Sequence, residues 1–101
     1  MNPPENMSEV IGGRRYSVKT ATLLAGDDFW DGSNFERGGR NEFLYRSKNG
    51  GYFTVTLTRW TGERDHLTPV SLQEAQELWE RLSERRVSFE KAFPGVKVED
   101  A

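Results

Sequence analysis

Cysteine is absent from the chain, and this absence excludes several kinds of chemistry at once. Without a thiol there can be no disulfide, no thiolate metal ligand and no cysteine nucleophile. The chain therefore needs no oxidising compartment in order to fold, and we expect it to lie in the cytoplasm.

Long apolar runs are absent too. No stretch approaches the roughly 18 consecutive apolar residues that a membrane-spanning helix needs. The N-terminal sequence MNPPENMSEVIGG has neither the basic start nor the apolar core of a signal peptide. We expect no contact with a membrane and no export through a signal peptide.

Histidine is scarce, since His66 is the only one in the sequence. A Ser-His-Asp triad would have to use it, yet its neighbours along a strand, Asp65 and Leu67, would point to the opposite face. A zinc site would need three carboxylates or a second chain. The acidic loop DDFWDGSN fails the calcium-loop pattern, because Phe29 and Gly38 stand where ligands are needed. We expect a protein that is not an enzyme and binds no cofactor or metal.

Net charge is only −2, but the charge is unevenly distributed. Residues 10–64 hold nine Lys and Arg against six Asp and Glu, whereas residues 65–101 hold five against eight. The sequence pI of 5.4 lies far below the value of about 9 that is typical of nucleic-acid-binding domains. The distribution predicts a dipolar domain rather than a basic one.

Two glycine pairs, Gly12-Gly13 and Gly38-Gly39, are each followed by arginine, but neither matches a phosphate-loop pattern. We expect them to permit sharp reversals of the chain. Four arginines near these pairs could nevertheless gather at one end of a sheet and bind an anion. These residues are Arg14, Arg15, Arg37 and Arg40.

Aromatic residues are plentiful, with six Phe, three Tyr and three Trp among 101 residues. They supply enough apolar area for one folded domain of this length.

We expect a flexible N-terminal segment over residues 1–13 and a single α+β domain over residues 14–98. Its antiparallel sheet would contain about four strands in a meander, with one main helix and a short C-terminal helix packed on one face.

Alternating apolar residues indicate where the outer strands lie. The run RRYSVKTATLL predicts a strand over Arg14–Leu24, and a later strand is expected over Arg64–Val70, where Pro69 favours a position at the sheet edge. Residues 25–41 separate the first strand from the next as a long loop, and loops of that length are often functional.

The clearest element is a hairpin over residues 41–60, NEFLYRSKNGGYFTVTLTRW. A two-residue Asn-Gly turn would place Leu44 opposite Val55, whereas a three-residue loop with Gly50 in a left-handed conformation would place Phe43 there. We favour the second register because it gathers the large apolar residues on one face. These are Phe43, Tyr45, Phe53, Val55 and Leu57. The opposite face would then be polar and open.

A helix is predicted to begin after Ser71, which forms a capping-box pattern with Glu74. Apolar residues then recur at helical spacing: Leu72, Ala75, Leu78, Trp79 and Leu82. Two alternatives remain open further along the chain. A single helix could continue to Ala92, or a break could precede a short second helix capped by Ser88.

Several short motifs follow one another between residues 44 and 75: Leu44-Tyr45-Arg46, Tyr52-Phe53, Trp60-x-Gly62-Glu63 and Glu74-Ala75. As a set they resemble the pattern of a family of small bacterial proteins with no assigned activity. The similarity covers Gly39 to Val96. It implies a bacterial origin and a fold of the kind outlined above, and it supplies no catalytic residue.

The polar face of the hairpin is the candidate binding surface, with Arg46, Tyr52 and Trp60 as its central residues and Arg40 and Trp30 beside them. Tyr, Trp and Arg are enriched at interaction hot spots, and they also stack on unpaired bases. The leading hypothesis is a non-catalytic binding or regulatory module that acts through protein–protein contacts, as a homodimer or with a larger partner. The alternative is binding of single-stranded nucleic acid. Either requires that the loop before the hairpin leave this face uncovered.

Overall fold

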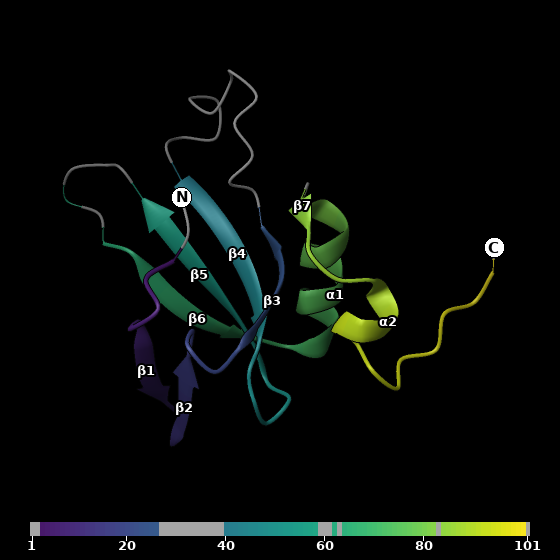
Figure 1. Ribbon diagram of the computed structural model, residues 1–101, viewed down its shortest axis with the longest axis horizontal. Helices are drawn as coiled ribbons and strands as arrows, with labels where there is room; N and C mark the ends of the chain where they lie inside the picture. The colour runs from purple at the N-terminus through teal and green to yellow at the C-terminus, as the bar shows by residue number, and fades with distance from the viewer. Residues whose placement is uncertain (1–2, 27–39, 59–61, 63, 83, 101) are drawn as a thin grey trace.

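The structure is a computed structural model that describes residues 3–26, 40–58, 62, 64–82 and 84–100 (Figure 1). Within these ranges the elements are β1 (Ser8–Ile11), β2 (Arg14–Ser17), β3 (Thr22–Gly26), β4 (Arg40–Arg46), β5 (Tyr52–Thr58), β6 (His66–Val70), α1 (Leu72–Arg81), β7 (Glu84–Arg85) and α2 (Phe89–Ala92). The protein is α+β, as the sequence predicts, with α1 as the main helix.

Five of the described strands form one antiparallel sheet in the order β6-β5-β4-β3-β7, and β1 and β2 form a separate hairpin. Figure 1 shows α1 and α2 to the right of the sheet and the β1–β2 hairpin to its lower left. The sheet is therefore a central layer with a cover on each face. It has one strand more than the approximate count from the sequence because of β7, a two-residue strand.

The β4–β5 hairpin has the three-residue loop that the sequence favours. Phe43 lies opposite Val55 in the ladder. Gly50 has a φ of 91°, and its N–H donates to the carbonyl of Ser47 over 3.0 Å. Such a φ is easily reached only without a Cβ, so glycine at this position determines the register of the whole hairpin.

The face that carries the large apolar side chains of the hairpin is buried, as expected. Its cover, however, is the β1–β2 hairpin and not the helices. The buried cluster consists of Tyr16, Val18, Phe43, Tyr45, Phe53, Val55, Leu57 and Leu67. Phe53 is at its centre, with its ring stacked on Tyr45 at 5.2 Å and approached edge-on by Tyr16 at 5.7 Å.

The opposite face is not open, and this corrects the expectation from the sequence. Leu44 on this face is fully buried, together with residues of β3 and of both helices. The cluster consists of Leu24, Ala25, Leu44, Ala75, Leu82, Ala92 and Phe93. The hairpin alone offers one large aliphatic residue here, but the neighbouring strands and helices supply the others.

A β-bulge in β3 makes this second cluster possible. The pairing of β3 with β4 shifts register between Leu23 and Ala25, so that Leu24 is an extra residue. Leu23 packs on the hairpin side of the sheet, whereas Leu24 and Ala25 both pack on the helix side. Strict alternation would have put Leu23 and Ala25 on the same face.

The helices follow the two-helix alternative. At the start of α1, the N–H of Glu74 donates to Oγ of Ser71 over 3.1 Å, and the N–H of Ser71 donates to Oε1 of Glu74 over 3.3 Å, which confirms the capping box. β7 then pairs with β3, and Ser88 caps α2. Neither of these described helices is long and apolar enough to cross a membrane.

The N-terminal part of the fold differs from the sequence expectation in two ways. The segment predicted as flexible, residues 1–13, contains β1, which turns into β2 through Gly12 and Gly13, with φ of 62° and 80°. The strand predicted over Arg14–Leu24 is divided by a turn. The division is needed because β2 lies in the hairpin layer and β3 in the central sheet.

Replacement of Phe53 by alanine tests the hairpin-side cluster. Phe53 has no exposed surface, so Phe53→Ala should lower the free energy of unfolding by about 3–5 kcal/mol in a urea titration. Val98→Ala is the control, because Val98 is 57% exposed. That change should stay within about 0.5 kcal/mol. A loss below about 1 kcal/mol for Phe53→Ala would contradict the assignment of Phe53 to the core.

Alkaline pH tests the burial of Tyr45. Desolvation raises the pKa of its hydroxyl from 10.0 to about 12. The folded-state pKa lies above the unfolded value, so the contribution of Tyr45 is complete below pH 10 and is lost as the pH rises to about 12. Urea titrations across this interval should show a steeper loss of stability for the wild type than for Tyr45→Phe. Parallel curves would refute the burial effect.

Candidate functional site

Two of the predicted binding residues, Arg46 and Tyr52, are opposite each other in the β4–β5 ladder, and both contact α2. Nη1 of Arg46 donates to the carbonyl of Lys91 over 2.7 Å and to that of Ala92 over 3.4 Å. The hydroxyl of Tyr52 donates to the same Ala92 carbonyl over 3.2 Å. The last carbonyls of a helix have no partner within it, so these contacts satisfy them.

Packing reinforces the contact between Tyr52 and α2. The ring of Tyr52 lies 5.3 Å from that of Phe93, which is fully buried. Burial raises the pKa of the Tyr52 hydroxyl, and the nearby charge of Arg46 lowers it in part. Both predicted binding residues are half-buried and attach α2 to the sheet, so a partner that used them would compete with these contacts.

The other predicted binding residues do not join this pair. Trp30 and Trp60 lie outside the described residues, as does most of the loop predicted over residues 25–41. Arg40 begins β4 opposite Thr58. Arg40 and Arg46 are six positions apart along the extended strand, a distance of about 20 Å.

The predicted gathering of four arginines is also wrong in part. A Cβ placed on Gly51 would lie 3.5 Å from Nη2 of Arg14, so Arg14 reaches the β4–β5 turn. Arg40 starts β4 at the end of the ladder far from that turn. Arg37 lies outside the described residues. The pair Arg14 and Arg15 remains together, because the two residues are adjacent in β2.

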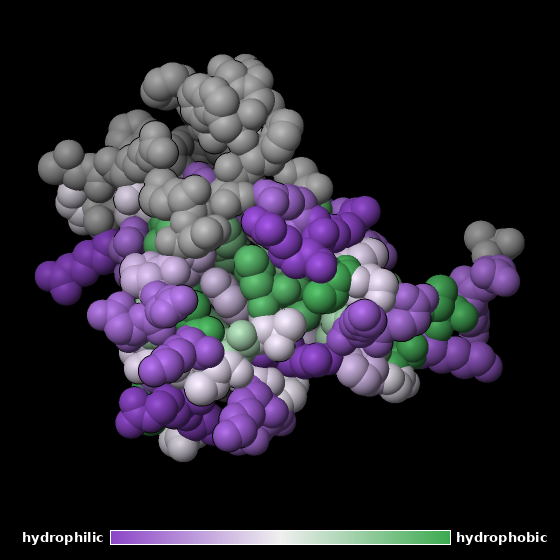
Figure 2. Space-filling view, viewed as in Figure 1, coloured by the Kyte–Doolittle hydropathy of each residue, from purple (hydrophilic) through white to green (hydrophobic). Residues whose placement is uncertain are grey.

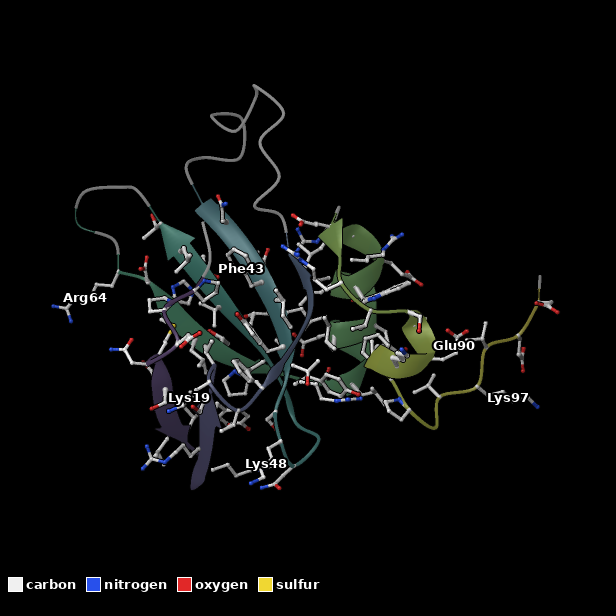
Figure 3. The ribbon with its side chains drawn as sticks, viewed as in Figure 1. Lys19, Phe43, Lys48, Arg64, Glu90 and Lys97 are labelled. Atoms are coloured by element: carbon white, nitrogen blue, oxygen red, sulfur yellow. The ribbon has the colours of Figure 1, made fainter. Side chains whose placement is uncertain are left out.

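Between β2 and the β4–β5 turn the structure forms a cavity of about 380 Å³, which we call the basic cleft. Its lining residues are Gly13, Arg14, Arg15, Tyr16, Ser17, Thr20, Ser47, Lys48 and Asn49. The volume falls within the range of about 300–1,000 Å³ that is usual for ligand sites. Figure 2 shows mainly hydrophilic residues at this corner, and Figure 3 shows Lys48 at the turn.

The electrostatics of the basic cleft favour an anion. Among the described residues that line it, three are cationic and none is acidic. No hydrogen bond or ion pair within the described part of the chain engages the side chain of Arg14, Arg15 or Lys48. Other cations do have internal partners, as Arg81 does with Glu42 at 3.0 Å. An external anion would therefore compete with no internal one.

The sequence predicts two of the three cationic residues of this site. Arg14 and Arg15 are predicted to bind an anion, but the sequence does not connect Lys48 with them, since more than thirty residues separate it from them. The link between the two segments is tertiary. Tyr16 of β2 packs on Phe53 of β5, and this contact brings β2 alongside the turn. A basic residue in an exposed turn gives no sequence signal of such a neighbour.

His66, the candidate for histidine chemistry, is exposed at the start of β6. Its Nδ1 lies 3.3 Å from the carbonyl oxygen of Arg64. Among the described residues, no group of three or more His, Asp and Glu side chains is placed to hold a metal ion.

Comparisons of the chain with family models, curated proteins and solved structures found no match. The resemblance to a bacterial family, and with it the bacterial origin, stays a prediction from the sequence.

Removal of the Tyr52 hydroxyl tests whether this residue holds α2. Tyr52→Phe keeps the ring on Phe93 and loses the hydrogen bond to Ala92. We expect about 0.5–1.5 kcal/mol less stability and faster amide exchange in α2. Tyr45→Phe is the control, because Tyr45 packs in the other cluster. Exchange in α2 that is equal in the two variants would contradict the attachment.

Proposed function

We propose that this chain is a small non-catalytic binding module that acts through protein–protein contacts, and that it does so through the basic cleft. The observation that carries the proposal is the gathering of Arg14, Arg15 and Lys48 around one cavity without an acidic lining residue among those described. The partner that this chemistry fits is an acidic protein segment. It can belong to a second copy of the chain or to another protein.

Charge complementarity supports this choice. Guanidinium groups form paired, charge-assisted hydrogen bonds with carboxylates and phosphates, and a basic surface also accelerates encounter with an acidic one. The three cationic side chains make no internal ion pair within the described residues, so binding would not break an existing one. The nearby side chains of Ser17, which is half-buried, and of Thr20 and Asn49, which are exposed, are uncharged and can donate further hydrogen bonds.

The sheet face predicted from the sequence is a poorer candidate for any partner. A single-stranded nucleic acid could stack there only if α2 left Arg46 and Tyr52, whose contacts satisfy its last carbonyls. Nucleic acid is therefore tested at the basic cleft instead. A catalytic role has no comparable support among the described residues, where His66 is exposed and its Nδ1 lies 3.3 Å from the backbone carbonyl of Arg64.

Charge reversal in the cleft tests the proposal. The probe is a fluorescein-labelled hexaglutamate peptide, and its binding is followed by fluorescence anisotropy at low and moderate salt. The double variant Arg14→Glu/Arg15→Glu should weaken binding about tenfold or more, and the wild-type affinity should fall with salt. The matched control, Arg64→Glu/Lys97→Glu, makes the same change in net charge at two exposed residues outside the cleft.

Three outcomes would contradict the proposal. These are no peptide binding at low salt, equal weakening by both double variants, and tighter binding of a single-stranded oligonucleotide of the same charge than of the peptide. Native mass spectrometry distinguishes the source of the acidic segment. A dimer that the cleft variant loses and the control keeps identifies the partner as a second copy.

A further inference from the structure

The pattern of hydrogen bonds between β1 and β2 shows which backbone groups point away from the hairpin. The N–H of Val18 donates to the carbonyl of Met7 over 3.0 Å, so these two residues face each other across the ladder. Hydrogen-bonded pairs in an antiparallel ladder alternate with non-bonded ones. Glu9 with Tyr16 and Ile11 with Arg14 are then the next bonded pairs.

Arg15 and Ser17 are the residues between those pairs on β2, so their N–H and C=O groups point outward. Within the described residues β2 has no strand on that side, and no other backbone hydrogen bond uses these groups. The outer edge of β2 therefore presents two donors and two acceptors in extended spacing.

This edge is also a wall of the basic cleft. Side chains of adjacent strand residues point to opposite faces. Arg14 and Arg15 nevertheless both line the cleft, and Ser17 lines it too. The cleft therefore lies along the edge of β2, where strand alternation directs Arg14 and Arg15 to opposite faces. Lys48 on the β4–β5 turn contributes to the opposite wall.

Other edges of the described fold are less suited to an added strand. At the edge of the main sheet, β6 contains Pro69, which has no N–H to donate. β1 carries the acidic Glu9, and none of its residues lines the basic cleft. Of these edges, that of β2 combines unpaired backbone groups with positive charge.

We propose that the partner segment binds by strand addition: it lies extended along the outer edge of β2 and pairs with the backbone of Arg15 and Ser17, while its anionic side chains contact Arg14, Arg15 and Lys48. This inference rests on the proposed function and specifies its binding mode. Backbone pairing supplies affinity without sequence selectivity, and the charged side chains supply selectivity. An added strand also places its side chains alternately on both faces, where one arginine stands on each.

The first test uses the wild-type protein and a nine-residue peptide of alternating glutamate and threonine, in two N-methylated forms. One form is methylated at the odd residues and the other at the even residues. Only alternate residues of an added strand point their N–H at β2, so one form should bind about tenfold or more weakly than the other. Equal affinities of the two forms would overturn strand addition.

The second test removes one donor from the protein. Ser17→Pro deletes an N–H that makes no bond to β1, and the extended conformation of Tyr16 before it is compatible with proline. Ser17→Ala is the control, because it removes the hydroxyl and keeps the N–H. Ser17→Pro should lose about tenfold in affinity for the unmethylated peptide, with unfolding midpoints close to those of Ser17→Ala.

The two proposals fail separately. If Arg14→Glu/Arg15→Glu abolishes peptide binding but neither methylation nor Ser17→Pro affects it, the basic cleft stands and strand addition fails. If the double charge variant has no effect, the proposed function fails as well. A peptide with phosphothreonine in place of one glutamate distinguishes the anion: tighter binding identifies a phosphoryl group, and weaker binding identifies carboxylates.

Discussion

The left-handed loop at Gly50 is the constraint on which the rest of this fold depends. Its three-residue length places Phe43 opposite Val55 and aligns every later pair of the hairpin. Slippage by one residue would move the aromatic side chains to the opposite face of the sheet. The hairpin layer packs on that aromatic face through Tyr16, so the position of β2, and with it the basic cleft, follows from the turn.

In a sheet with two covered faces, strand alternation places some polar residues in the interior, and these residues need hydrogen-bond partners. On the helix side the protein pairs them with backbone carbonyls. Thr54 is 6% exposed, and its hydroxyl lies 3.4 Å from the carbonyl of Thr68. Arg46 and Tyr52 reach the end of α2. Polar and aromatic residues that look functional in the sequence thus meet structural needs, since buried polar groups require partners.

The sequence predicts the features that neighbouring residues determine, but not those that depend on pairing between distant segments. The turn residues predict the β4–β5 register, and the capping-box pattern of Ser71 and Glu74 predicts the start of α1. The sequence does not predict the strand β1, because its four residues are exposed or half-buried and lack alternation. The bulge at Leu24 and the two-residue β7 arise from pairing with distant segments, and no local pattern encodes them. The same reason explains why the helices lie on the face that the sequence predicts to be open.

The candidate site shows the same limit. A sequence gives the number of charged residues, but it does not show which of them have partners in the fold. Arg46 and Arg85 donate hydrogen bonds to helix carbonyls, and Arg81 forms an ion pair with a carboxylate. These three arginines therefore have partners within the protein. Arg14 and Arg15 stand instead on a strand whose outer edge is unpaired within the described residues. A segment that brought both backbone partners and negative charge would satisfy at once the two kinds of group that the fold leaves unsatisfied there.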